Sequence, residues 1–436
     1  MKTGKQLEPS PEAPRLCPKP GGTMRTLLLV LCAGLAAIHC KKPATVISPD
    51  EANFQKKLQE SLLTAKPGSV IELPAGTFHL DKGMTLSEKG VTIRGAGMDK
   101  TILSFKGQTE GAAGIMVSQG DFLIEDLTIQ DTTKDAIKVT GAKNVTFRRI
   151  KTEWTEGAKE TNGAYGIYPV QCENVLIEES VAIGASDAGI YVGQSKNIIV
   201  RRNRAEMNVA GIEIENSTFA DVYENTSTNN TGGILVFDLP DLPVQGGKNT
   251  RIFKNQIVSN NLKNFAPSGN IVAMVPTGTG FMIMANDNIE AFENTIKDNI
   301  TTNVLIVSYL VTEKPIKDKN YDPYPEAIHV HNNTITGGGV DPTGGNSLAS
   351  RVAVAGLRAK LGKPFPQVLW DGIVNKARFP DRKLTPDAQI CIRDNGNADF
   401  GNFDAANNMS DIKRDLAVHN CSHPALSPNR IPGVRD

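Results

Sequence analysis

Charged residues that lie far apart along this chain alternate in sign at a regular spacing. They align when the segments FLIEDL, VTFRRI, VLIEES, IIVRRN, ADVYEN, RIFKN and EAFEN are superimposed at their ends. The last position but one then reads Asp126, Arg149, Glu179, Arg202, Glu224, Lys254 and Glu293. The steps are 22 or 23 residues, or 30 or 39 where a loop is inserted. Stacked parallel strands lie about 4.8 Å apart and favour opposite charges on neighbours, so this alternation predicts a β-solenoid.

The columns on either side of this one follow the same spacing. The preceding column reads Arg94, Glu125, Arg148, Glu178 and Arg201, and then becomes aromatic at Tyr223, Phe253 and Phe292. The following column carries asparagine in the later segments, at Asn203, Asn225, Asn255, Asn294 and Asn333. Stacked inward amides can bond one another and the turn backbone, which satisfies polar groups that are buried there.

A second set of apolar segments marks another strand of each coil. It comprises AIKV, GIYPV, GIYV, GIEI, GILV, FMIM and VLIV. Three strands in a turn of 22 residues predict an all-β fold, a right-handed parallel β-helix with three strands per coil. We expect a leader in residues 1–39, a tether and N-terminal capping helix in 40–67, the β-helix in 68–340, and a C-terminal cap and tail in 341–436.

The N-terminal region has the features of an export signal. Met24 and Arg25 precede the apolar run LLLVLCAGLAAI, which is too short to span a bilayer and ends near Cys40. This pattern predicts an exported protein of the periplasm or outer surface, held to a membrane only by a lipid on Cys40, with plain cleavage before Cys40 as the alternative. The 436 residues carry a formal net charge of zero, which gives no reason to expect nucleic-acid binding.

Cysteine and histidine usage limits the other kinds of site. Export permits a disulfide, and the predicted pair is Cys391–Cys421, whereas Cys172 is expected to be a buried small side chain. The six histidines form no cluster except His329 and His331, which share one face of a strand. Two ligands without a third do not define a metal site. We therefore predict no metal and no cofactor, and calcium has no support.

Polar and aromatic residues gather in one outward column of the second set of strands. Residues that lie between inward Ile and Val positions face solvent. This column is predicted to be Lys138, Tyr168, Tyr191, Glu213, Leu235, Ile283 and Ile306. Asp135 and Asp187 lie in the turns before two of these strands, and Glu153 and Trp154 border an inserted loop. Aromatic rings stack on sugars, and carboxylates bond hydroxyl groups, so the column predicts a carbohydrate site.

Three functions remain open on these residues. In the leading hypothesis the chain binds a polysaccharide of the cell envelope, with uronic-acid-containing glycans as one class. The predicted contacts are Asp135, Glu153, Trp154, Tyr165 and Glu213.

The second hypothesis is a lyase or epimerase that uses Tyr168, Tyr191, Lys138 and Asp187, in which a tyrosine moves protons and Lys138 neutralises a sugar carboxylate. The third is a scaffold that binds a partner protein through Leu235, Ile283 and Ile306. Tyrosines that only stabilise neighbouring rungs are the alternative without a site.

Over residues 68–340 the coils resemble the pectate-lyase-like right-handed β-helix superfamily, whose opening coils are similar to IELPAGTFHL and VTIRGAG. Several segments are also similar to a bacterial family of exported or lipid-anchored parallel β-helix proteins. They are GAYGIYPVQCENVLIEES, SDAGIYVGQSKNIIVRRN, NVAGIEIENS, NTGGILVFDLP and ICIRDNGNADF. This resemblance implies the fold and an exported location, but no particular reaction.

The segment YGIYPV at residues 165–170 resembles the Tyr-Gly-x-Asp-Pro-His signature of mannuronan C5-epimerases. Tyr165, Gly166 and Pro169 match, whereas Tyr168 replaces the catalytic Asp and Val170 replaces the His. Both reacting groups of that family are therefore missing, and the resemblance does not carry the epimerase mechanism to this chain.

Overall fold

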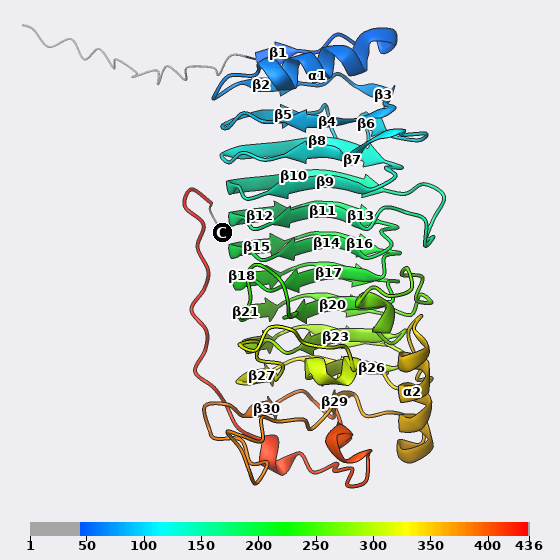
Figure 1. Cartoon of the computed structure of the whole chain (residues 1–436), viewed down its shortest axis with the longest axis vertical. Coiled ribbons are helices and arrows are strands. Elements are labelled where there is room, and N and C mark those ends of the chain that lie inside the picture. Colours follow the sequence, from blue (N-terminus) through cyan, green and yellow to red (C-terminus); the bar gives the residue numbers. More distant parts are fainter. Residues whose placement is uncertain (1–43, 435–436) are drawn as a thin grey trace, which may run out of the picture. The chain divides into compact units, whose positions relative to one another are not determined.

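The computed structural model describes residues 44–434, which belong to one compact unit. The predicted leader and Cys40 lie outside these residues. Strands from successive coils stack in parallel, as β12 does on β10 and β15 does on β12 (Figure 1). The prediction of an all-β parallel β-helix is confirmed.

Each coil contributes to three faces. We call the first the charge face, because it carries the alternating columns. Its strands are β1 (Ala44–Val46), β2 (Val70–Glu72), β5 (Thr92–Arg94), β8 (Phe122–Gln130), β10 (Lys143–Glu153), β12 (Glu173–Glu178), β15 (Lys196–Arg201), β18 (Thr218–Tyr223), β21 (Lys248–Phe253), β24 (Asp287–Phe292), β27 (Ile328–His331) and β30 (Ile390–Arg393).

The second face is made of short strands, and β8 and β10 run on into it. Its other strands are β3 (Gly76–His79), β6 (Thr101–Ser104), β13 (Val181–Ile183), β16 (Arg204–Glu206), β19 (Thr226–Thr228), β22 (Gln256–Val258), β25 (Thr295–Lys297) and β28 (Thr334–Thr336).

We call the third face the tyrosine face. Its strands are β4 (Lys82–Leu86), β7 (Glu110–Val117), β9 (Asp135–Thr140), β11 (Tyr165–Val170), β14 (Ala188–Gly193), β17 (Ala210–Glu215), β20 (Gly232–Phe237), β23 (Thr279–Met284), β26 (Thr302–Val307), β29 (Val368–Trp370) and β31 (Phe400–Asn402).

The first alternating column lies at the corner between the charge face and the second face. Each of its members has a left-handed backbone, with φ from 49° at Arg149 to 61° at Asp126. This conformation is uncommon for residues other than Gly, Asn and Asp, and it turns the chain at the same place in every coil. Ion pairs join neighbouring rungs, such as Arg149–Asp126 at 2.5 Å and Arg202–Glu224 at 2.9 Å.

The second alternating column points outward from the charge face. Glu178 lies between Arg148 at 2.6 Å and Arg201 at 2.8 Å, so its carboxylate has a cation on each neighbouring rung. The column then changes from charge pairing to ring stacking, with Tyr223 and Phe253 stacked at 4.7 Å between centroids. The predicted rung-by-rung pairing is therefore confirmed.

Two columns of buried asparagines, here called asparagine ladders, run along the coil from one rung to the next. Along the first, each side-chain amide donates to the carbonyl oxygen of the next, as from Asn225 to Asn255 at 3.0 Å and from Asn255 to Asn294 at 2.9 Å. A second ladder includes Asn208 and Asn230 at the turn into the tyrosine face, joined at 3.0 Å. Inside them, fully buried Ile, Val and Phe side chains form the layers of the core.

Helices cover parts of the coil. The N-terminal helix begins with η1 (Glu51–Asn53), continues as α1 (Phe54–Thr64) and buries Phe54, Leu58 and Leu62 against the first coils. The others are α2 (Leu348–Leu361), η2 (Val272–Met274), η3 (Tyr309–Thr312), η4 (Ala405–Asn407) and η5 (Ala417–His419). Among residues 44–434, no helix combines the length and the apolarity needed to cross a membrane.

The β-helix continues past residue 340, where we expected it to end. β29 pairs with β26, and β30 pairs with β27, so α2 is an insertion between rungs rather than part of a terminal cap. After β30, the predicted disulfide Cys391–Cys421 holds the chain, and a tail returns along the charge face past β24 and β18 (Figure 1). Cys172 is buried and unpaired with any cysteine of the described part, as predicted.

Candidate functional site

The register of the tyrosine face confirms part of the predicted outward column and corrects the rest. Tyr168 pairs with Lys138, Tyr191 with Glu213, and Glu213 with Leu235. The next two outward positions are Met282 and Leu305, which follow Leu235 in register. A shift of one residue in a strand moves every side chain to the other face, and our alignment of FMIM and VLIV was shifted in this way.

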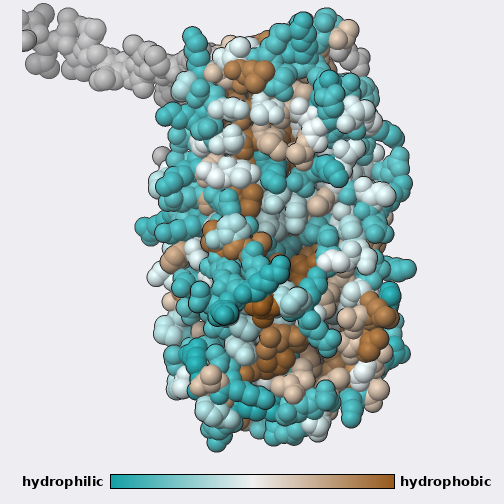
Figure 2. Space-filling model, viewed as in Figure 1, coloured by the Kyte–Doolittle hydropathy of each residue, from teal (hydrophilic) through white to brown (hydrophobic). Residues whose placement is uncertain are grey.

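Ile283 and Ile306 therefore point into the core, where both are 0% exposed. The outward Leu235, Met282 and Leu305 are also buried, because they form an apolar cluster with Val272 of η2 and Val354 of α2, which cover this part of the tyrosine face. The predicted protein-binding surface of Leu235, Ile283 and Ile306 is thus wrong. Figure 2 shows one side of the surface, where hydrophilic residues surround small apolar patches.

η2 and α2 leave the part of the tyrosine face around β9 and β11 half-buried. There three tyrosine rings pack together, with centroids 4.4 Å apart for Tyr165 and Tyr168, 4.6 Å for Tyr165 and Tyr191, and 4.9 Å for Tyr168 and Tyr191. Nζ of Lys138 lies 4.6 Å from the Tyr168 ring centroid, a cation–π contact. Tyr165, Tyr168 and Lys138 are each half-buried, so a ligand can reach them from solvent.

Carboxyl groups lie beneath these rings. The Tyr191 hydroxyl donates to Oε1 of Glu215 at 2.5 Å, and the Tyr165 hydroxyl lies 3.5 Å from Oδ2 of Asp187. Asn270, from the insertion at residues 259–278, donates to the same Asp187 oxygen at 3.3 Å. Glu213 is 1% exposed, and neither of its carboxyl oxygens has a hydrogen-bond partner among residues 44–434.

Burial and mutual repulsion raise the pKa values of these acids. Desolvation raises the pKa of Asp187, and the nearby Glu215 carboxylate raises it further. Desolvation likewise raises the pKa of Glu213, where Asp187 and Glu215 add repulsion. At the rim, burial raises the pKa of Asp135 to about 6, although Lys138 and Lys134 oppose that rise. These carboxyl groups therefore keep protons at a pH where exposed acids have lost theirs.

The tyrosines act as proton donors rather than as bases. Desolvation, followed by the Asp135 carboxylate, raises the pKa of Tyr168 to about 12. Desolvation also raises the pKa of Tyr191, and the Glu215 carboxylate contributes to that rise. At neutral pH the cluster thus presents phenol and carboxyl hydroxyls as donors, with Lys138 at its edge. Such a surface can bond sugar hydroxyls and can exchange protons within itself.

Two predicted contacts do not belong to this cluster. Trp154 is 5% exposed and lies in the core, where its Nε1 donates to the Thr132 carbonyl at 2.7 Å. Glu153 lies at the end of β10, where it pairs with Lys151 at 2.7 Å and accepts from Gln130. Glu153 thus forms contacts on the outer side of β10, and Trp154, just after the end of this strand, packs inward.

The cluster also contains residues that the sequence analysis missed. Glu215 lies two positions after Glu213 and so occupies the next outward place on β17, which the alternation of strand residues could have shown. Asn270 comes from an insertion that does not follow the repeat of the coils. Nothing in the sequence therefore indicated that it contacts Asp187.

A separate cluster on the charge face could hold a metal ion. Among the described residues, Glu290, His329 and His331 form a group of three side chains with suitable ligand atoms close together. The histidine pair was recognised in the sequence, but its third partner was not.

Comparisons with known proteins agree with the fold. The family model of the right-handed β-helix region matches residues 89–248. No curated protein shows a significant sequence match.

Three solved structures illustrate the likeness. The A-module of the Azotobacter vinelandii mannuronan C-5 epimerase AlgE4 is 20% identical, with 67% of this chain and 86% of that chain covered and a TM-score of 0.49. A family 28 exopolygalacturonase of Yersinia enterocolitica is 13% identical (70% and 67% covered, TM-score 0.39), and the pectate lyase Pel9A is 13% identical (67% and 70% covered, TM-score 0.35). In fold, the chain is a right-handed parallel β-helix.

Proposed function

We propose that the half-buried part of the tyrosine face binds a polysaccharide, and that the protein is exported to the cell envelope. The observation that carries this proposal is the packing of Tyr165, Tyr168 and Tyr191 over buried carboxyl groups, with Lys138 alongside. Aromatic rings and fixed hydroxyl donors are the groups that sugar-binding surfaces use. The Cys391–Cys421 disulfide supports an oxidising compartment.

Uronic-acid-containing glycans suit the charges of this site at neutral or mildly acidic pH. While the buried acids keep their protons, the carboxylate of a uronate can approach Lys138 without strong repulsion. As the pH rises, Asp135, Asp187, Glu213 and Glu215 lose protons one after another, since burial raises the pKa of each. The tyrosines stay neutral through this range.

The test compares acidic and neutral oligosaccharides by calorimetry at about pH 5.5 and about pH 8. We expect the affinity for a uronate oligomer to fall by about tenfold or more at the higher pH, because at least one nearby charge changes over that range. A neutral oligosaccharide of equal length should show little change. Binding of the neutral oligosaccharide alone would keep the site but reject the uronate class.

Matched variants distinguish binding at this site from nonspecific binding elsewhere on the surface. Tyr168→Ala and Lys138→Met should each weaken uronate binding. The control is Phe219→Ala, which removes a ring that is 47% exposed on the charge face and should leave binding unchanged. Equal loss in all three variants, or no binding of any glycan by the wild type, would contradict the proposal.

A lyase or epimerase remains the second candidate, because proton donors and acceptors are in contact at this site. Tyr191 and Glu215 are bonded at 2.5 Å, and desolvation raises the pKa of Asp187, so this carboxyl group can act as a base at a pH high enough to remove its proton. Asp187 would accept the C5 proton next to the sugar carboxylate, while Lys138 neutralises that carboxylate. Tyr168 or Tyr191 would then give a proton to the opposite face of C5 in an epimerase, or to the glycosidic oxygen that leaves as its bond to C4 breaks in a lyase. Asp187 lies under Tyr165 and Asn270, so a substrate would have to displace these side chains, and for this reason we propose binding first and catalysis second.

Asp187→Asn tests this second candidate. It should abolish any formation of unsaturated uronate or any change at C5, with oligomer binding retained. Turnover that survives in Asp187→Asn would remove the catalytic role of this residue.

A further inference from the structure

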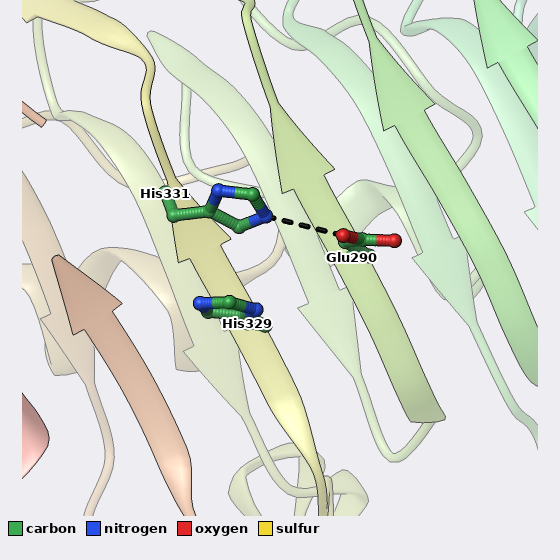
Figure 3. A group of neighbouring side chains, drawn as sticks. All are labelled: Glu290, His329 and His331. Atoms are coloured by element: carbon green, nitrogen blue, oxygen red, sulfur yellow. Dashed lines mark hydrogen bonds and ion pairs between the residues drawn. The ribbon is translucent and has the colours of Figure 1, made fainter. Parts of the chain in front are cut away.

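Glu290, His329 and His331 lie together on the outward side of the charge face. Glu290 on β24 is in register with His329 on β27, and His331 follows two positions later, on the same side of that strand. Figure 3 shows the carboxylate and both imidazole rings on the same side of two neighbouring strands. The stacking of neighbouring strands therefore brings one carboxylate and two imidazoles, all possible metal ligands, close together.

Their distances are close to those of a coordination sphere. One ligand atom from each residue lies within 4.8 Å of the others, and Nε2 of His331 is 3.2 Å from Oε1 of Glu290. In a tetrahedral zinc site the metal–ligand bonds of about 2.0–2.2 Å place ligand atoms about 3.3 Å apart. Small side-chain rotations would close the remaining gap.

The buried ring of His329 independently indicates that this group of side chains binds a ligand. The side chain is buried, with 6% of the residue exposed, and neither ring nitrogen has a hydrogen-bond partner within residues 44–434. A buried polar group without a partner costs about 1–3 kcal/mol. The ring stacks on His331 at 3.9 Å between centroids, which holds it in the orientation that Figure 3 shows.

The surroundings fix the carboxylate and leave room for an ion. The other oxygen of Glu290, Oε2, accepts from the backbone N–H of Leu426 in the tail at 2.9 Å. Hydrogen bonds of this kind orient metal ligands. Arg251, in register with Glu290 on the next rung, pairs with Asp221 at 2.8 Å.

A cavity of about 510 Å³ adjoins the group, and its lining includes Glu290, His329 and the tail residue His423. The His423 ring centroid lies 6.1 Å from that of His329. The disulfide anchors this part of the tail, because Cys391 is in register with His329 and is bonded to Cys421. The cavity gives an ion a way in and leaves space for a further ligand or for water.

We propose that Glu290, His329 and His331 bind one divalent transition-metal ion of the zinc class, with the remaining coordination position facing the cavity. Two imidazoles and one carboxylate suit a borderline ion such as Zn²⁺ rather than Ca²⁺ or Mg²⁺, which prefer oxygen ligands. The site lies on the charge face and is separate from the tyrosine cluster, so it does not depend on the glycan proposal.

The test titrates the full chain, treated with a chelator and desalted, with Zn²⁺ alone by calorimetry at about pH 7.5. We expect saturable binding of one ion per chain, and Co²⁺ should give the visible absorption of a four- or five-coordinate site. Glu290→Gln and His329→Gln should each lower the Zn²⁺ affinity by at least about 100-fold. The matched controls Glu293→Gln and His79→Gln alter exposed residues and should bind as the wild type does.

Thermal unfolding measurements show whether each variant is folded, so that a loss of Zn²⁺ binding is not mistaken for misfolding. Zn²⁺ should raise the melting temperature of the wild type and of both controls, whereas Glu290→Gln should melt cooperatively with no Zn²⁺-dependent shift. Two results would overturn the proposal. One is a wild type without saturable Zn²⁺ binding, and the other is Glu290→Gln and His329→Gln variants that keep wild-type affinity.

Discussion

The charge face and the tyrosine face are built on the same rungs, yet they treat acidic side chains in opposite ways. On the charge face, Glu178 lies between Arg148 and Arg201, each on a neighbouring rung. On the tyrosine face, Asp187, Glu213 and Glu215 lie close enough to raise one another's pKa, and Glu213 has no partner in the described chain. Pairing serves the fold, whereas crowded acids cost stability and so indicate a function.

Glu178 on the charge face and Glu213 on the tyrosine face differ in the direction of their pKa shifts. Burial alone would raise the pKa of Glu178, but hydrogen bonds from Arg148 and Arg201 outweigh it and lower that pKa. On the tyrosine face, desolvation raises the pKa of Glu213 without an opposing cation. Stability from Glu178 is lost as the pH falls, whereas stability from Glu213 is lost as the pH rises.

The largest expected effect comes from breaking a buried pair on the charge face. Arg201→Met removes the guanidinium that bonds Glu178 and the Tyr223 hydroxyl, and should lower the free energy of unfolding by about 3 kcal/mol. Denaturant titration at neutral pH measures this. The control Arg202→Met removes an exposed pair and should cost less than about 1 kcal/mol. Similar losses in both variants would contradict the distinction between buried and exposed pairs.

The next effect is the pH dependence of stability. The folded acids of the tyrosine face hold protons that the unfolded chain has already released, so the free energy of unfolding should fall as the pH rises from about 5 towards 7. The expected slope is about 1.4 kcal/mol per pH unit for each acid that keeps its proton in the folded chain. The triple variant Asp187→Asn, Glu213→Gln, Glu215→Gln should flatten this slope. A wild-type stability that rises over the same range would argue against protonated acids on this face.

A smaller effect of opposite sign is expected from Glu213→Leu. The substitution replaces a buried carboxyl group that has no hydrogen-bond partner in the described chain, and should stabilise the protein by about 1 kcal/mol at neutral pH. Glycan binding should weaken in the same variant. Lower stability together with normal binding would make Glu213 a structural residue, and this outcome would remove the acid from the proposed site.

The smallest effect concerns Lys138 at the rim of the tyrosine face. Lys138 opposes the rise in the pKa of Asp135 that burial causes. Lys138→Met should therefore raise the Asp135 pKa further, by about half a unit, as followed by carboxyl-selective NMR titration. An unchanged Asp135 pKa would show that the lysine is solvated and plays no electrostatic part in the site.

The sequence was sufficient for features that repeat with the coil. The alternating column, the asparagine ladder and the Lys138–Tyr168–Tyr191 strip could be found because each rung repeats the preceding one. The same alignment also contained the metal cluster, since Glu290 and His329 each lie four residues before a ladder asparagine. We read the histidines by themselves and so missed the acid on the neighbouring rung.

Features without a period could not be predicted in this way. Asn270 reaches Asp187 from an insertion, and the tail reaches Glu290 through the backbone of Leu426. Ile283 was placed on the wrong side because the apolar segment FMIM fits either register, and the methionine at position 282 takes the outward place. Trp154 was assigned to a site from its position beside a loop, although its ring fills the core.

Infrared difference spectroscopy of the carboxyl groups tests the central contrast most directly. The account predicts that at neutral pH the folded wild type shows an absorption band of protonated carboxyl groups, which becomes weaker in the triple variant Asp187→Asn, Glu213→Gln, Glu215→Gln. Glu178→Gln should leave this band unchanged, because the acid on the charge face is already ionised. A neutral-pH spectrum without protonated carboxyl groups, or a band of unchanged intensity in the triple variant, would contradict the account.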